Sequence, residues 1–143
     1  MSTTWKWYGL GLKRAWTGDI DYMADTIKCA LLTSAYTPNQ DTDETWAAIS
    51  GSEVAGAGYT AGGVALTTKA LTYTAGTNIL AFDCDDPQWN PSTIANARIA
   101  VMHDTTTGYL IGFNDFGANK SSDDDNFQIV LDATGFLKQT AAA

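Results

Sequence analysis

Short apolar runs separated by polar turn sequences constrain the fold of this chain more than any other feature. They recur at intervals of roughly eight to twelve residues, the spacing typical of antiparallel sandwiches. The clearest run is Thr26–Thr33, in which Ile27, Cys29 and Leu31 alternate with their neighbours. The other expected strands are Val64–Thr67, Leu71–Thr74, Asn78–Cys84, Thr93–His103, Tyr109–Phe113, Phe127–Leu131 and Phe136–Lys138. The pattern predicts a mainly β fold, an antiparallel β-sandwich or jelly roll, in one domain spanning residues 1–143.

The polar segments between these runs are expected to be turns and loops. Thr105–Gly108 is expected to close a hairpin, and Asp85–Pro91 to form a loop bounded by prolines. Asn119–Asn126 contains three consecutive aspartates and is expected to be a solvated loop. At the ends, residues 1–8 are interpreted as an N-terminal arm, and residues 140–143 are expected to fray.

One segment carries clear helix signals, from Thr42 to Ser50. Asp41 or Thr42 can accept hydrogen bonds from the first free backbone N–H groups, and the acidic residues that follow suit the positive end of the helix dipole. Gly51 stands where a C-cap glycine is expected. The sequence therefore predicts a short helix that ends at Ser50.

Apolar residues within this helix predict how it docks. Trp46 and Ile49 lie three residues apart and share one face, so we expect Trp46 to anchor the helix to the sheet with Ile49 beside it. A second short helix or turn is expected over Leu10–Thr17, where Leu12 and Trp16 fit one helical face.

Composition and charge exclude several classes of protein. The chain has 143 residues, of which 45% are hydrophobic and 11% aromatic, which is too apolar for a disordered protein. Its net charge of −8 argues against a nucleic-acid partner, which requires clustered Lys and Arg. No apolar run approaches the length of a membrane span, and the N-terminus is not expected to be a signal peptide. Cys29 and Cys84 are expected to be free thiols.

Residues with catalytic or metal-binding potential do not combine into a recognisable site. His103 precedes Asp104, but no activated serine or cysteine accompanies them, so a histidine at the end of a strand is the better interpretation. The acidic clusters at residues 83–86 and 123–125 lack the spacing of a calcium loop. The glycines between Gly56 and Gly63 lack the Lys-Ser/Thr of a phosphate loop. We therefore expect a binding or structural protein, with no enzymatic activity, no cofactor and no metal.

Several motifs resemble a family of structural proteins encoded in gene clusters of tailed bacteriophages and prophages. The most specific is the YTAGG sequence that ends at Gly63. The matching segments are Gly9–Leu12, Asp25–Asp41, Thr42–Ser50, Glu53–Gly63, Ala97–His103 and Leu110–Gly117, so the resemblance spans nearly the whole chain.

The resemblance implies a virion protein, and in particular a capsid decoration (cement) protein. Such a protein would be assembled in the host cytoplasm and bind the major capsid protein on the exterior of the head, as a homo-oligomer such as a dimer or trimer. The alternative is a tail, collar or fibre module that binds another virion protein or a host glycan.

Two aromatic segments are candidates for the attachment surface, on the expectation that both are free of sheet pairing. The first is the N-terminal arm with Trp5, Trp7 and Tyr8. The second is the glycine-rich segment with Gly58 and Tyr59, where glycines would let another backbone come close. The alternative is that Trp5 and Trp7 pack on their own sheet and that the glycines only form turns.

Overall fold

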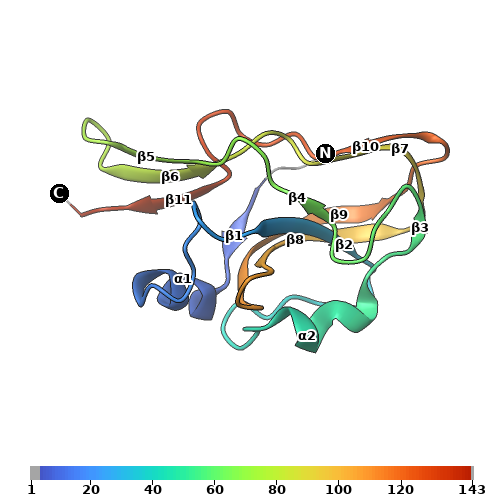
Figure 1. The fold of residues 1–143 in the computed structure, drawn as a ribbon, viewed down its shortest axis with the longest axis horizontal. Coiled ribbons are helices and arrows are strands. Elements are labelled where there is room, and N and C mark those ends of the chain that lie inside the picture. The colour runs from blue at the N-terminus through green and yellow to red at the C-terminus, as the bar shows by residue number, and fades with distance from the viewer. Residues whose placement is uncertain (1–3, 143) are drawn as a thin grey trace.

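The computed structural model describes residues 4–142 and confirms a mainly β fold, with 42% strand and 11% helix in a sandwich-like arrangement of three antiparallel sheets (Figure 1). The elements are β1 (Lys6–Trp7), α1 (Gly9–Trp16), β2 (Ile27–Leu32), α2 (Trp46–Ile49), the 3-10 helix η1 (Ser50–Ser52), β3 (Gly56–Ala57), β4 (Val64–Ala65), β5 (Ala70–Thr74), β6 (Ile79–Asp83), β7 (Gln88–Ile94), β8 (Ala97–Asp104), β9 (Leu110–Lys120), β10 (Asp125–Gln128) and β11 (Leu137–Thr140).

The central sheet has five strands in the order β1-β9-β8-β2-β4. Strand β2 is buried almost throughout and pairs with β8 from Ile27 opposite Asp104 to Leu32 opposite Ile99. The expected hairpin joins β8 to β9, and its turn is held by Asp104, whose Oδ1 accepts the backbone N–H groups of Thr106 and Thr107. An aspartate that accepts backbone N–H groups two and three residues ahead is a common way to fix such a turn.

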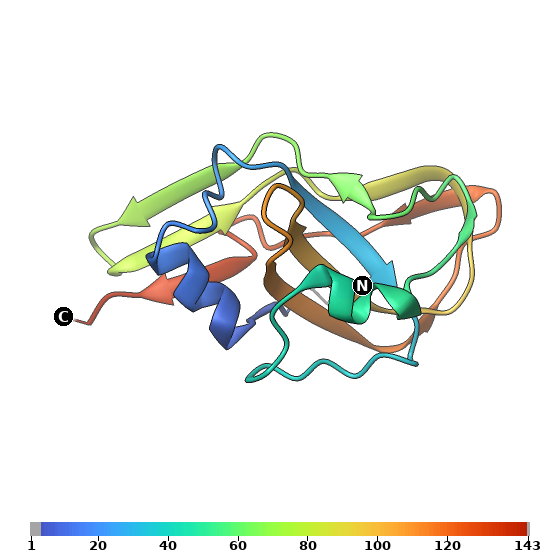
Figure 2. The same ribbon diagram turned by 60° about the horizontal axis from the view of Figure 1, so that its bottom comes forward.

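The two faces of the central sheet pack against different layers. One face carries alternate residues of β2, including Cys29 and Leu31, and contributes to the larger core cluster together with residues of sheets β10-β7-β3 and β11-β6-β5. The other face contributes Leu32 and Ile99 to a second cluster, which includes Tyr8 and Ile49. Figure 2 shows α2 in front of the central sheet and α1 beside the sheet β11-β6-β5.

The helix predicted over Thr42–Ser50 is shorter than expected, because α2 begins only at Trp46. The three residues before it have tertiary partners instead: Asp43 accepts a hydrogen bond from Tyr36, Glu44 binds Arg14, and Thr45 forms a β-bridge with Tyr109. Asp41 and Thr42 therefore cap nothing, and Gly51 lies inside η1 with no left-handed φ. The expected second helix is confirmed as α1.

Trp46 docks α2 as expected, although it is only partly buried. Its indole stacks on the imidazole of His103 with ring centroids 4.2 Å apart and an interplanar angle of 12°. Ile49 beside it is buried in the second cluster. The helix is thus attached to β8 by an aromatic stack at its start and an aliphatic contact at its end.

Several predicted strand boundaries were wrong. The expected loop Asp85–Pro91 contains the start of β7, and the strand predicted over Thr93–His103 is interrupted at Asn96, which has a φ of 58°. The loop predicted over Asn119–Asn126 is shorter than expected, since β9 runs to Lys120 and β10 begins at Asp125. The last strands are shifted as well, to Asp125–Gln128 and Leu137–Thr140.

The chain ends are more closely held than the sequence indicates. Residues 1–3 of the predicted N-terminal arm and residue 143 of the predicted frayed end lie outside the described residues. Within the described part, Lys6 and Trp7 pair with β9, opposite Phe113 and Gly112. At the other end, the Ala141 N–H donates to the Asn78 carbonyl over 2.7 Å.

Candidate functional site: an apolar groove beside a short helix

The N-terminal aromatic residues predicted as an attachment surface are mostly core residues. Trp5 is 8% exposed and packs edge-on against Phe136, with ring centroids 5.6 Å apart. Tyr8 is fully buried, and its hydroxyl lies 2.7 Å from that of Tyr36. Trp7 is partly buried and donates from Nε1 to the Lys138 carbonyl. The expectation that this segment is free of sheet pairing is wrong, because β1 is an edge strand of the central sheet.

The second predicted segment is also tied to its own chain. Strand β3 pairs with β7, and a Cβ on Gly58 would lie 2.1 Å from the Pro91 carbonyl oxygen, so the backbone that the glycine allows to come close belongs to this chain. The Tyr59 hydroxyl donates to Glu53 Oε1 over 2.7 Å and accepts from the Leu31 N–H. The two predicted segments are not brought together, since β1 and β3 are edge strands of different sheets.

His103 and Asp104 do not form a catalytic pair. His103 lies beneath Trp46, with Nε2 2.8 Å from the Gly62 carbonyl oxygen, and burial lowers the pKa of its imidazole. Asp104 turns instead toward its hairpin and toward Asp25. Burial and the neighbouring Asp25 carboxyl raise the pKa of Asp104, while the hydrogen bond between the two carboxyl groups lowers the pKa of Asp25.

Residues 4–142 were expected to contain two free cysteines, Cys29 and Cys84, and the structure shows both as buried thiols. Within that range no cluster of three or more His, Cys, Asp or Glu side chains could hold a metal ion. No helix in the same range is long and apolar enough to cross a membrane. Burial raises the pKa of Cys84 to about 12.

An apolar groove of about 460 Å³ lies between α1 and the sheet β11-β6-β5. Its lining comes from α1, from the connection that follows it and from all three strands of the sheet. The main lining residues are Leu12, Ala15, Trp16, Ile20, Tyr22, Met23, Leu71, Leu80, Phe82 and Gln139. Among the side chains that line the groove, only the Asp21 carboxylate and the Tyr22 phenol could act as an acid, a base or a nucleophile. The Tyr22 hydroxyl is already bound to the Asp83 carbonyl.

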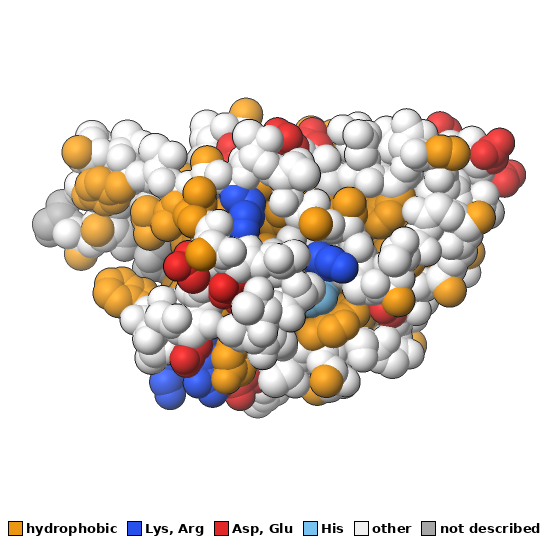
Figure 3. Space-filling model, viewed as in Figure 1, with side chains coloured by type: hydrophobic (Ala, Val, Ile, Leu, Met, Phe, Trp, Pro, Cys, Tyr) orange, Lys and Arg blue, Asp and Glu red, His pale blue; other side chains and the backbone are white. Residues whose placement is uncertain are grey.

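Large apolar side chains are exposed mainly around this groove. Trp16 is 81% exposed, Met23 48% and Leu71 42%, and all three line it. Tyr73, 53% exposed, lies two residues from Leu71 on the same face of β5. Of the exposed large hydrophobic residues in the described chain, only Val130 belongs elsewhere. Figure 3 shows the hydrophobic side chains gathered over this end of the molecule. Clustered exposed apolar side chains make this groove the candidate interaction surface of the molecule.

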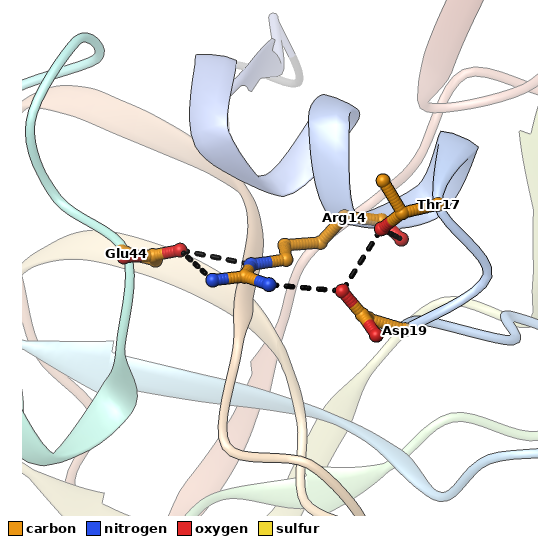
Figure 4. A network of polar contacts seen from close by, with 4 residues as sticks. All are labelled: Arg14, Thr17, Asp19 and Glu44. Atoms are coloured by element: carbon orange, nitrogen blue, oxygen red, sulfur yellow. Dashed lines mark hydrogen bonds and ion pairs between the residues drawn. The ribbon is translucent and has the colours of Figure 1, made fainter.

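A network of polar contacts fixes the end of α1 that carries Trp16 (Figure 4). The Arg14 guanidinium binds Glu44 Oε1 through Nε at 2.9 Å and Nη2 at 2.8 Å, and Asp19 Oδ2 through Nη1 at 2.9 Å. Asp19 also accepts from the Thr17 hydroxyl, and the Arg14 bond holds its pKa below the usual range. The guanidinium lies 4.4 Å from the centroid of the Tyr109 ring. Trp16 is therefore presented by a helix end that is attached at several points.

Neither Trp16 nor Leu71 was predicted as a site residue from the sequence. Their exposure depends on α1 and β5 meeting at one end of the fold, across about fifty residues of chain that no local pattern relates. One signal was available, since no charged residue occurs between Lys69 and Asp83 although the chain carries a net charge of −8.

The chain was compared with protein-family models, with curated proteins and with solved structures, and none of them matches it.

Proposed function

We propose that this protein is a non-enzymatic structural protein of a tailed-bacteriophage virion, and specifically a capsid decoration protein that binds the major capsid protein on the outside of the head. The sequence resemblance supports the virion role. The net charge of −8 suits a protein that is kept on the outer surface, away from packaged DNA.

The observation that carries the proposal is the exposed apolar groove with Trp16 on its rim. Trp is among the residues enriched at the positions that dominate the energetics of protein interfaces. Here Trp16 is 81% exposed on a helix end that the Arg14 network holds in place. The groove therefore offers a pre-formed site for apolar side chains of the capsid protein, and it replaces the N-terminal arm and the Tyr59 segment as the proposed attachment surface.

Binding to capsids that lack this protein tests the proposal. We expect Trp16→Ala to weaken binding by about 10-fold or more, as for an interface residue that dominates affinity. The melting temperature of this variant should equal that of the wild type, because the exposed Trp16 side chain contributes little to the stability of the folded state. Val130→Ala is the matched control, since Val130 is 51% exposed but lies outside the groove, and it should bind as the wild type does.

The outcomes distinguish the site from the role. If Trp16→Ala saturates the capsids with unchanged affinity, the groove is not the attachment surface. The copy number in purified virions tests the role directly: hundreds of copies per particle support decoration, whereas a dozen or fewer would show a tail, collar or fibre protein instead.

A further inference from the structure

The outer edge of β5 has no strand beside it. Strand β5 is the end strand of the sheet β11-β6-β5 and pairs only with β6, from Ala70 opposite Asp83 to Thr74 opposite Ile79. No backbone hydrogen bond within residues 4–142 reaches its other edge. Leu71–Thr74 are all exposed. Alternate residues of β5 therefore present unpaired N–H and C=O groups to the surroundings, as edge strands do.

Strand β5 is unusual among the edge strands because nothing blocks it. Proteins protect edge strands by making them very short or by placing charges on them. In the described chain, β1, β3 and β4 have two residues each, β10 contains Asp125, and β11 contains Lys138. Strand β5 has five residues, no charge, no proline and no bulge in its pairing with β6.

The composition around β5 favours a second copy of this chain as the strand that covers the edge. Two molecules with a net charge of −8 repel each other, so self-association requires a contact free of like charges. The uncharged run 70–82 forms the whole β5–β6 hairpin except its last residue. It also contains two of the exposed large apolar side chains, Leu71 and Tyr73, on one face of the edge strand.

We propose that β5 pairs antiparallel with β5 of a second copy, which joins the two three-stranded sheets into one sheet of six strands. Full overlap of the five residues centres the two-fold axis on Thr72, so Thr72 lies opposite Thr72 of the second copy. Leu71 then lies opposite Tyr73 of the second copy, and this cross-strand pair of an aliphatic and an aromatic side chain occurs twice. The residue contacts are self-complementary, as a two-fold interface requires.

This arrangement places both grooves on the same side of the combined sheet, because the two-fold axis is perpendicular to the sheet. If the grooves bind capsid protein, a step that rests on the proposed function, the dimer binds the lattice at two sites. Two linked contacts raise the avidity without any new contact. The pairing itself does not depend on the capsid role.

Charge substitutions at Thr72 test both the pairing and its register. The wild type is expected to sediment with twice the mass of the 15.3 kDa chain. Thr72→Lys and Thr72→Glu should each be monomeric, since like charges would lie directly opposite each other across the axis. An equimolar mixture of the two variants should recover the dimer, as one chain of each. Ala75→Lys, which adds the same charge in the turn after β5, is the matched control and should remain dimeric.

A wild type that stays monomeric at concentrations up to about 1 mM would overturn the proposal. So would a dimer that Thr72→Lys leaves intact, or monomeric variants that fail to combine when mixed. Circular dichroism establishes that each variant is folded. Hydrogen exchange of the wild type gives a second measurement: amides of β5 should become protected as the concentration rises. Failure of the capsid role is distinguishable, because Trp16→Ala should remain dimeric whether or not it binds capsids.

Discussion

His103 shows how one buried side chain can make the stability of this protein depend on pH. Its imidazole is covered by Trp46 and hydrogen-bonded to the Gly62 carbonyl, which requires the proton to be on Nε2 of the neutral ring. Burial lowers its pKa, and the nearby Lys28 acts in the same direction. The folded state therefore resists protonation that the unfolded state accepts.

We expect the protein to lose stability as the pH falls below about 6.5, the pKa of an unperturbed histidine. In that range the unfolded chain binds a proton at His103 and the folded chain does not, until the pH reaches the lowered pKa of the folded state. Above this range His103 is neutral in both states and contributes nothing. Thermal unfolding between pH 7 and pH 5 measures the effect.

His103→Gln is the control for this prediction, because its amide can still donate to Gly62 but does not titrate. The variant should lose less stability than the wild type over the same range. Other groups, including Asp104, titrate in both proteins and cancel in the comparison. Parallel pH profiles for the two proteins would show that His103 is not the group responsible.

At the scale of elements, strands could be predicted from the sequence where burial alone determines them. Strand β2 was found because its alternating apolar residues are buried between packed layers. The start of α2 was not, because the acidic residues Asp43 and Glu44, which suit the first turn of a helix, bind Tyr36 and Arg14 instead. Strand β7 was missed because its Asn90-Pro91 sequence resembles a loop.

The candidate site was less predictable than the fold. The sequence indicates which residues are aromatic but not which of them the packing leaves exposed. Trp5 and Trp16 are equally conspicuous in the sequence, yet the first packs against Phe136 and the second is 81% exposed. The residue that covers Trp5 comes from the opposite end of the chain, so no local pattern predicts its burial.

The paired glycines of the YTAGG segment provide a matched test at this scale. Gly62 and Gly63 have φ values of 90° and 87°, so alanine at either position should cost about 1–2 kcal/mol in backbone strain. A Cβ on Gly62 would meet only the Lys28 side chain at 3.9 Å, whereas on Gly63 it would lie 1.9 Å from the Cys29 carbonyl oxygen. We expect Gly63→Ala to cost a further 1–3 kcal/mol or so, as for overpacking, in denaturant unfolding.

Equal losses for the two glycine variants would contradict this account, because they would show that strain alone matters. A larger loss at Gly63 would support a role for this glycine in bringing the chain close enough to β2 for β4 to pair with it. The most specific motif of the sequence would then have a structural role, separate from partner binding.

At the scale of the whole molecule, the N-terminal segment joins the central sheet to the sheet β11-β6-β5. Strand β1 pairs with β9, while Trp5 packs on Phe136 and the Trp7 Nε1 donates to the Lys138 carbonyl. The segment thus contacts both sheets. Removal of a free N-terminal arm would leave the fold intact. This packing predicts instead that removing the segment destabilises the entire fold.

We expect Trp5→Ala to lower the free energy of unfolding by about 3–5 kcal/mol, the range for a buried large aromatic residue. Lys6→Ala, one residue further along the same strand, is the control and should cost less than about 0.5 kcal/mol, because Lys6 is exposed. Deletion of residues 2–7 removes Trp5, Trp7 and the pairing of β1 together, so its loss should exceed that of Trp5→Ala. Since domains of this size are stable by only about 5–15 kcal/mol, the truncated chain should be partly unfolded or melt far below the wild type. A truncated protein with the wild-type melting temperature would show that β1 and its two tryptophans are dispensable for folding.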